Sequence, residues 1–254
     1  MTHPSQLEHL CIVLVNTRNP LNLGAAARAM SNFGVFDLRV VNPYEASFRE
    51  ARSAVGASEV LAKAREYESV AGAVADCALV VGTTSAARRE LQHPLYRLDP
   101  GAKLIRKQLG TARVALLFGS EKRGLSNEDL SHCHWLMRIP TREEHGSMNL
   151  GQAVAVCLYE LARSRAEASS VRRSKKSERE AATAARSADL ERITATLLDA
   201  LRASGYLDSK PSAAANEKIR RMVRRLKLSA EDSELLLGML RQMVWKMESR
   251  ANSK

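Results

Sequence analysis

The chain has 254 residues, and its 39 lysines and arginines outnumber its 28 aspartates and glutamates, which gives a formal net charge of +11. This excess of positive charge favours a polyanionic partner such as nucleic acid, because cations that neutralise phosphates release condensed counterions. No apolar stretch approaches the roughly 20 residues needed to cross a bilayer, which excludes a membrane-spanning protein and predicts no membrane partner.

The four cysteines argue against a disulfide framework or a metal-stabilised fold. They are widely spaced with no C-x-x-C pair, and no secretory signal pattern opens the sequence. We therefore expect reduced thiols and a cytoplasmic location. The run HCH at 132–134 has no matching ligand pair elsewhere in the sequence, so we expect no structural metal.

Residues 1–165 are expected to form one α/β domain. Short runs rich in Val, Leu and Ile alternate with stretches of helical character, which is typical of a parallel sheet whose strands are buried on both faces. The expected strands are Leu10–Val15, Phe36–Val41, Ala78–Gly82, Arg113–Phe118 and Trp135–Ile139, and the expected helices cover residues 22–32, 47–64, 68–75, 126–132 and 148–164.

The character of the sequence changes near residue 165. Residues 166–186 carry many charges of both signs and almost no large apolar side chain, so we interpret them as a charged linker. Residues 187–254 show only helical periodicity and are expected to form a helical RNA-binding extension. Gly205 stands where its first helix would end, and SAED at 229–232 has the pattern of a helix N-cap. Three apolar stripes are expected to form its core: Leu190, Ile193, Leu197 and Leu201; Ile219, Met222, Val223 and Leu226; and Leu236, Leu240, Met243, Val244 and Met247.

The middle of this extension carries an unusual concentration of cations. The run KIRRMVRRLK at 218–227 contains six lysines and arginines and no acid. A solvated helix face usually mixes charges of both signs. We therefore favour an RNA-facing helix whose contacts are Arg220, Arg221, Arg224 and Arg225.

Three parts of the α/β domain place small, polar or basic residues just after an expected strand. They are RNPLNLGAAARAM at 18–30, VVGTTSAARR at 80–89 with ALLFGSEKRGLS at 115–126, and IPTREEHGSMNLGQAVAV at 139–156. Open α/β sheets bind ligands at the carboxyl ends of their strands, so these segments are expected to line one crevice. Neither the dinucleotide-binding pattern G-x-G-x-x-G nor the P-loop pattern G-x-x-x-x-G-K-[ST] is present.

The segments NLGAAARAM, LLFGSEKRGLS and IPTREEHGSMNLGQAVAVCLYELAR together resemble, in order and spacing, the three motifs of the SPOUT superfamily of RNA methyltransferases. The resemblance covers residues 8–165. It implies a parallel sheet with a deep trefoil knot formed by residues 119–164, which periodicity alone would not predict because knots are so rare. The run GTTSAARR and the basic C-terminal extension are most similar to the branch that methylates the ribose 2'-hydroxyl of tRNA nucleotide 32.

The resemblance also implies a cofactor, a homodimer and a set of site residues. The residues that would hold S-adenosylmethionine are Thr84, Ser85, Ala86, Gly119, Ile139, Gly146, Ser147, Met148 and Asn149. Catalysis would involve Arg28, Asn22, Glu121 and Ser147. Contacts to RNA would come from Arg28, Arg88 and Arg89. In the homodimer the first motif of one subunit would complete the site of the other. Because a guanidinium keeps its proton at neutral pH, Arg28 is expected to act as a fixed cation that clamps the target phosphate. The proton acceptor stays open, and the reaction requires no metal.

Two alternative functions stay open from the sequence. One is an rRNA ribose 2'-O-methyltransferase of the same superfamily, although many of those enzymes carry an N-terminal RNA-binding extension. The other is a non-catalytic RNA-binding or assembly factor on the same scaffold, which calorimetry with S-adenosylmethionine would distinguish.

Overall fold

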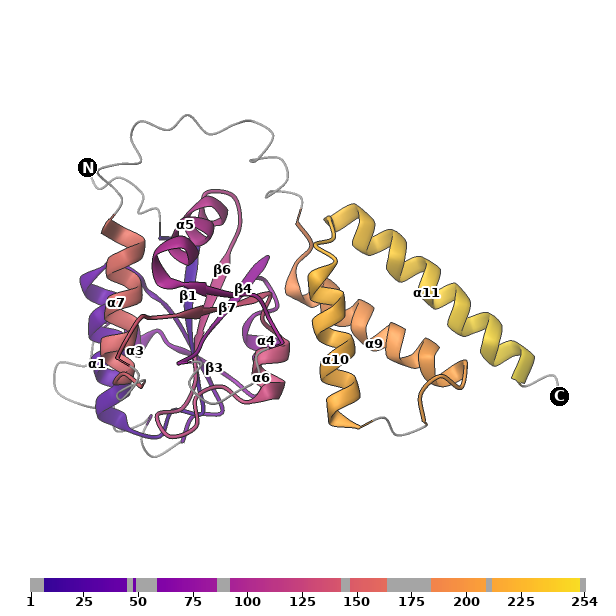
Figure 1. Cartoon of the computed structure of the whole chain (residues 1–254), viewed down its shortest axis with the longest axis horizontal. Coiled ribbons are helices and arrows are strands. Elements are labelled where there is room, and N and C mark those ends of the chain that lie inside the picture. The colour runs from indigo at the N-terminus through magenta and orange to yellow at the C-terminus, as the bar shows by residue number, and fades with distance from the viewer. Residues whose placement is uncertain are drawn as a thin grey trace.

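The computed structural model describes residues 7–44, 48, 59–85, 92–142, 147–163, 184–208 and 212–251. In this part of the chain, seven parallel strands form one sheet in the order β3-β2-β1-β6-β4-β7-β5 (Figure 1). The strands are β1 (Leu10–Val15), β2 (Asp37–Val41), β3 (Arg65–Tyr67), β4 (Leu79–Thr83), β5 (Leu95–Arg97), β6 (Val114–Phe118) and β7 (Trp135–Arg138).

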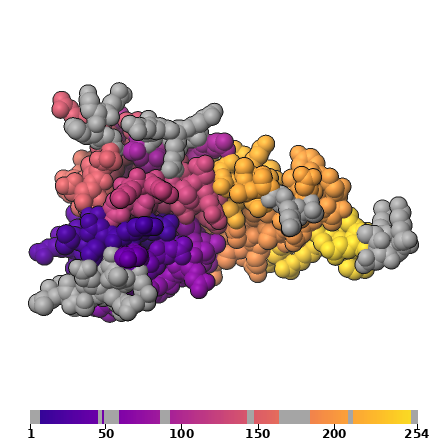
Figure 2. Space-filling view, turned by 90° about the horizontal axis from the view of Figure 1, so that it is seen from below, coloured from indigo at the N-terminus to yellow at the C-terminus, as the bar shows by residue number. Residues whose placement is uncertain are grey.

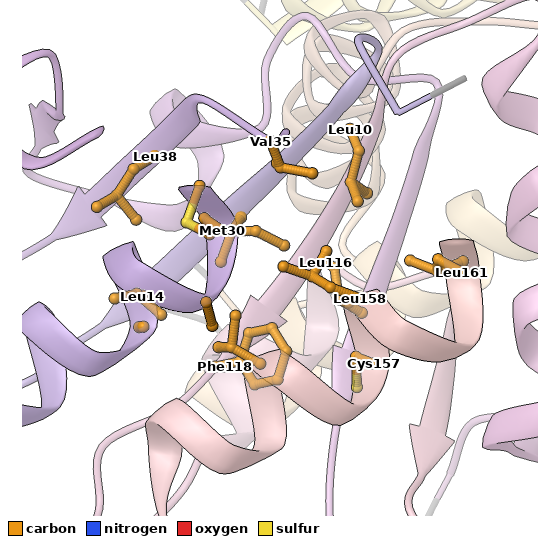
Figure 3. Packing of buried hydrophobic residues seen from close by; sticks show 14 of the residues in the cluster. Leu10, Leu14, Met30, Val35, Leu38, Leu116, Phe118, Cys157, Leu158 and Leu161 are labelled. Atoms are coloured by element: carbon orange, nitrogen blue, oxygen red, sulfur yellow. The ribbon is translucent and has the colours of Figure 1, made fainter. Parts of the chain in front are cut away.

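Helices cover both faces of this sheet. They are α1 (Pro20–Asn32), α3 (Glu59–Ala62), α4 (Val70–Ala73), α5 (Leu98–Leu109), α6 (Asn127–Ser131) and α7 (Leu150–Arg163). Strand β1 has an apolar residue at every position, and its side chains alternate between two buried clusters: Leu10 packs in the cluster with α1, α5 and α7, and Cys11 packs in the cluster with α4 and α6. Figure 3 shows the first cluster, in which Met30, Leu116 and Leu158 lie together.

The α/β class expected from the sequence is confirmed. Each of the five expected strands is present, with ends that differ by no more than one residue from those expected. The structure adds β3, β5 and α5, which the sequence reasoning missed. The helix expected over 68–75 is confined to α4, and of the helix expected over 47–64 only Phe48 and residues 59–64 are described, with α3 among them.

Three further helices follow in the C-terminal extension: α9 (Ser187–Ala203), α10 (Ala213–Arg225) and α11 (Ala230–Ala251). Two expected helix boundaries are confirmed. Gly205 follows α9 with a φ of 75°, as a residue that ends a helix often does. The Ser229 hydroxyl accepts a hydrogen bond of 3.0 Å from the amide of Asp232 at the start of α11. The helices enclose a small core of their own, made of Ala185, Leu190, Ile193, Val223, Leu237 and Leu240.

The apolar stripe expected along α10 is largely wrong. Val223 is fully buried, but Met222 is 38% exposed and Leu226 is 50% exposed. The reason is that α10 turns part of its basic face inward, where Arg224 finds hydrogen-bond partners. Met243 of α11, also expected in the core, is 55% exposed.

The extension packs against the side of the α/β domain that carries α4 and α6, and Figure 2 shows it as a second lobe. The amides of Ser187 and Ala188 donate hydrogen bonds of 2.9 and 3.0 Å to the carbonyl oxygens of Cys77 and Ala75. Residues 164–183 lie outside the described residues, so the linker interpretation stays a prediction. Among the helices described, none has the length and apolar character needed to cross a membrane.

The amino ends of the strands hold a structural ion cluster. The guanidinium of Arg39, 1% exposed, pairs with Asp37 at 2.8 Å and with Asp76 at 2.5 Å. Arg113 adds a contact of 2.6 Å to Asp37. Because opposite charges are paired throughout, this edge of the sheet serves stability, and the polar loops at the carboxyl edge are the place to look for chemistry.

Candidate active site

The carboxyl ends of three neighbouring strands bring the expected cofactor residues to one edge of the sheet. Strand β4 lies between β6 and β7. The Thr83 hydroxyl donates to the carbonyl of Leu117 at 2.8 Å, and the Thr84 amide donates to the carbonyl of Met137 at 3.0 Å. The residues that follow these strands, Thr84, Ser85, Gly119 and Ile139, therefore lie on adjacent strand ends. Ala86 and Gly146 lie outside the described residues.

The third motif enters α7 through a side-chain cap. The side-chain oxygen Oδ1 of Asn149 accepts hydrogen bonds from the backbone amides of Gly151 at 3.0 Å and Gln152 at 3.4 Å. Asn149 is therefore the residue that caps α7. Ser147 is exposed and Met148 is half-buried just before it.

The three motifs meet in a chain of side-chain hydrogen bonds. The Asn22 amide nitrogen donates to Oε1 of Glu121 at 2.9 Å, and the Asn149 amide nitrogen donates to Oδ1 of Asn22, also at 2.9 Å. Asn22 thus uses both ends of its amide, so its orientation is fixed by Glu121 on one side and Asn149 on the other. We call Glu121, Asn22 and Asn149 the motif network.

Glu121 is carried on a loop that is closed very tightly. The Gly124 amide donates to the carbonyl of Ser120 at 2.8 Å, and Gly124 has a φ of 66°. A Cβ at Gly119 would lie 2.0 Å from the carbonyl carbon of Gly124 and 2.1 Å from the nitrogen of Leu125. Only glycine fits at residue 119, and this close approach fixes where Glu121 stands.

Asn22 and Asn149 are held at the correct separation by the packing of α1 against α7. A Cβ at Gly151 would lie 2.5 Å from the Cβ of Ala25 and 3.2 Å from its carbonyl carbon. The small residues of both motifs therefore allow the two helices to touch. This contact, rather than phosphate binding, explains part of the glycine and alanine content of the first motif.

Arg28 lies apart from the motif network of its own chain. It is exposed on α1, six residues beyond Asn22, which corresponds to about 9 Å along the helix axis. It also does not line the cleft described next. Of the expected catalytic set, the fold brings together Asn22 and Glu121 but not Arg28.

A cleft of about 860 Å³ opens beside the motif network. Its two walls are the loop that leads into α1, at residues 16–22, and the loop that follows β6, at residues 120–129. Asn22 and Glu121 line it, together with the cations Arg18, Lys122 and Arg123. The sequence reasoning missed these three cations, although they stand within a few residues of the motif positions.

Two expected RNA contacts of α10 are engaged with α9 and α6 instead. Arg224 is 2% exposed, and its guanidinium donates to Ser187 at 3.2 Å and to Glu191 at 3.4 Å. Arg220 donates to Glu191 at 2.9 Å and to Ser131 at 3.0 Å. The expectation that Arg224 contacts RNA is therefore wrong, because its side chain is buried between the helices.

The remaining cations of α10 differ in their surroundings. Arg221 donates to the side chain of Gln92 at 2.5 Å, whereas Arg225 is exposed.

Two histidines lie next to the interface between α10 and the α/β domain. Burial and the nearby arginines lower the pKa of His132 to about 3, and burial and Arg224 lower the pKa of His134 to about 3. Arg88 and Arg89 lie outside the described residues. No group of three or more His, Cys, Asp or Glu side chains in the described ranges is arranged to hold a metal ion.

Comparison with known proteins agrees with this arrangement. Residues 9–159 match the SpoU rRNA Methylase family. The chain is 35% identical to the tRNA (cytidine/uridine-2'-O-)-methyltransferase TrmJ of Sodalis glossinidius, and the alignment covers 92% of this chain and 91% of that protein. It is 34% identical to the TrmJ of Photorhabdus laumondii, with 92% of this chain and 96% of that protein covered.

Solved structures show the same similarity. The crystal structure of TrmJ from Z. mobilis superposes with a TM-score of 0.76 at 30% identity, covering 92% of this chain and 98% of that one. A probable methylase family protein from Haemophilus influenzae superposes with a TM-score of 0.57 at 29% identity, covering 96% and 99%. The chain therefore belongs to the SpoU rRNA Methylase family and, within it, to the TrmJ methyltransferases.

Proposed function

We propose that this protein transfers a methyl group from S-adenosylmethionine to a ribose 2'-hydroxyl of tRNA, at nucleotide 32 of the anticodon loop. The observation that carries the proposal is the motif network, because it joins one residue from each of the three SPOUT motifs at the carboxyl edge of the sheet. The TrmJ relatives are named as tRNA (cytidine/uridine-2'-O-)-methyltransferases and match this chain over nearly its whole length, including the helical extension.

The strand ends of β6, β4 and β7 fit the cofactor. Their loops offer backbone amides and carbonyls, the hydroxyls of Thr84 and Ser85, and the half-buried apolar side chains of Ile139 and Met148. Such a mixture suits a ligand that combines an adenosine with an amino acid. Bound there, S-adenosylmethionine supplies a methyl group on a positively charged sulfur. The described residues proposed to hold it are Thr84, Ser85, Gly119, Ile139, Ser147, Met148 and Asn149. Ala86 and Gly146, which adjoin them in the sequence, are proposed as further contacts.

The protein's own contribution is positioning and electrostatics. A ribose hydroxyl is a weak nucleophile and must lose its proton. Glu121 and Asn149 fix the amide of Asn22, which then orients the ribose, and Ser147 supports the same site. A guanidinium is a fixed cation, so Arg28 clamps the target phosphate and stabilises negative charge developing on the 2'-oxygen. The proton leaves through a phosphate oxygen or water.

We further propose that Arg28 acts across a homodimer interface. Within one chain it is exposed and about 9 Å along α1 from Asn22. Helices α1 and α7 lie side by side on one face of the domain, and each presents a large apolar side chain to solvent: Leu21 is 79% exposed and Tyr159 is 57% exposed. A second copy docked on this face would bury both side chains and bring its Arg28 toward the site.

Family membership leads us to infer that residues 119–164 form a deep trefoil knot. The strand order supports this inference. Strand β7 lies beyond β4, two positions from β6, and α7, which follows β7 in the chain, packs against both α1 and α5.

The helical extension is proposed to hold tRNA through the cations that it leaves exposed. In the run 218–227 these are Lys218, Arg225 and Lys227, rather than the buried Arg224. Arg88 and Arg89, next to the cofactor residues in the sequence, are proposed as further RNA contacts.

The proposal is tested by mapping the methyl group. The protein is incubated with isotopically labelled S-adenosylmethionine and unmodified tRNA, and the RNA is digested and analysed by mass spectrometry. Label on the 2'-oxygen of nucleotide 32 is the expected result. The variant Asn22→Ala should lower kcat/KM about 100-fold through lost positioning. The control Lys103→Ala, at an exposed position on α5 outside the cleft, should match the wild type. Label in rRNA alone would favour the alternative substrate class, and cofactor binding without transfer to any RNA would favour a non-catalytic factor.

A further inference from the structure

Helix α6 connects the tight loop that carries Glu121 to the helical extension. Its amino end follows that loop directly, and α10 of the extension packs beside it (Figure 1). The helix spans only Asn127–Ser131, and so short a helix is not stable unless other parts of the protein hold it. Leu130 packs it against the sheet, so the contacts at its two ends decide how it is oriented there.

The amino end of α6 is tied to the loop by a reciprocal cap. The Asp129 amide donates to the Ser126 hydroxyl at 3.1 Å, and the Ser126 amide donates to the Asp129 carboxylate at 2.8 Å. Leu125, the residue before this cap, lies so close to Gly119 that a Cβ at Gly119 would be 2.1 Å from the Leu125 nitrogen. A shift of α6 is therefore passed to the loop that positions Glu121.

The carboxyl end of α6 is held by an arginine of the extension. Arg220 donates to the Ser131 hydroxyl at 3.0 Å, and the same guanidinium donates to Glu191 of α9 at 2.9 Å. The Ser131 hydroxyl in turn donates to the carbonyl of Glu128 at 2.6 Å, within α6. Ser131 is fully buried and the side chain of Arg220 is only 17% exposed, so this contact is internal to the protein.

We propose that Arg220 is a positioning residue for methyl transfer, which acts through Ser131 and α6 on the loop that carries Glu121. The inference rests on the proposed function, because it takes Glu121 and Asn22 to orient the ribose. Loss of the contact leaves the carboxyl end of α6 free to shift, and a displacement of about 1 Å near the reacting groups can lower a rate about 100-fold. The extension then has a second role beside tRNA binding, which is to keep the motif network in place.

The test compares Arg220→Gln and Ser131→Ala with the wild type in the full-length protein. The measurements are the single-turnover rate of methyl transfer at saturating tRNA and S-adenosylmethionine, the Kd for each of the two, and the melting temperature. The matched control is Arg192→Gln, because Arg192 is exposed and its ion pair with Asp189 stays within α9. Ser131→Ala removes a single hydroxyl, so it keeps the test valid if Arg220→Gln fails to fold.

Each variant should lower the saturating rate about tenfold and leave both Kd values at those of the wild type. Arg192→Gln should match the wild type in rate and melting temperature. The double variant of Arg220→Gln and Ser131→Ala should lose no more rate than Arg220→Gln alone, because both changes remove one contact. In the Asn22→Ala background, Arg220→Gln should lower the rate no further, because the motif network is already broken.

Three results would overturn the proposal. One is a wild-type saturating rate in both Arg220→Gln and Ser131→Ala, even if their melting temperatures fall, because the contact would then serve stability alone. The second is a weaker Kd for tRNA at a wild-type saturating rate, because Arg220 would then act in RNA binding. The third is a further tenfold loss in the Asn22→Ala background. A failure of the proposed function is seen separately, as wild-type protein that transfers no methyl group to any RNA.

Discussion

The substitution Gly119→Ala probes the tight loop that carries Glu121. The new Cβ would lie 2.0 Å from the carbonyl carbon of Gly124 and 2.1 Å from the nitrogen of Leu125. Non-bonded carbons prefer about 3.5 to 4 Å, so the loop must open by more than about 1 Å. The clash is with backbone, which cannot rotate away as a flexible side chain could.

Two costs follow from this opening. Overpacking costs roughly 1–3 kcal/mol, and losing the hydrogen bond between the Gly124 amide and Ser120 costs about 1 kcal/mol more. We therefore expect the free energy of unfolding to fall by roughly 2–4 kcal/mol, which is about 5–15 °C in melting temperature for a chain of this size. Because a displacement of about 1 Å can cost 100-fold in rate, methyl transfer to tRNA should fall about 100-fold.

The assay combines thermal unfolding with single-turnover methyl transfer at a temperature well below the melting point of the variant. Gly238→Ala in α11 is the matched control, because its Cβ would meet nothing within 4 Å and alanine favours a helix interior by about 1 kcal/mol. That variant should melt slightly higher than the wild type and keep its activity. If Gly119→Ala kept both the melting temperature and the rate of the wild type, the loop would not control Glu121.

Three further predictions concern other parts of the structure. Gly151→Ala should separate α1 from α7, because its Cβ would lie 2.5 Å from a facing Cβ, and should lower the rate of tRNA methylation at least tenfold with little change at the distant C-terminal helices. The half-buried His134 accepts a hydrogen bond from the Val80 amide at 3.1 Å, and burial lowers its pKa to about 3. Between pH 6.5 and 3 only the unfolded chain protonates this imidazole, so His134 alone should lower the free energy of unfolding by roughly 1–2 kcal/mol from pH 7 to pH 5. Urea titrations should show that His134→Gln loses this part of the pH dependence. Glu191→Ala leaves the buried Arg224 without its carboxylate and should make the helical extension more sensitive to limited proteolysis, whereas an unchanged cleavage pattern would contradict the pairing.

The sequence predicted those elements whose residues carry a strong local signal. Strands β1, β4 and β6 are apolar on both faces, so their alternation with helices could be recognised without a structure. Helix α5 was not predicted, and the pair Pro100-Gly101 near its start is a pattern typical of turns. In the structure Pro100 lies in the first helical turn, where a proline is tolerated, and Gly101 is buried against the sheet. Strands β3 and β5 have three residues each, which is too short for a period to be seen.

The residues proposed for the site could be named from the sequence, but the contacts between them could not. Asn22 and Glu121 are 99 residues apart in the chain, and Asn149 is 127 residues from Asn22, so only the fold brings them into contact. The inward turn of Arg224 could not be predicted either. A helical pattern assigns arginines to solvent, and only a buried partner such as Glu191 makes the opposite orientation stable.

The central claim is that one subunit's motif network works with the partner's Arg28, and a heterodimer tests it most directly. Chains carrying Arg28→Ala and chains carrying Glu121→Ala, with different affinity tags, are coexpressed, and the mixed dimer is isolated by both tags. If the two residues act in opposite subunits, one of the two sites is intact, so the heterodimer should methylate tRNA at about half the wild-type rate while both mutant homodimers are nearly inactive. A heterodimer as inactive as the homodimers, or an Arg28→Ala homodimer with the wild-type rate, would contradict the account.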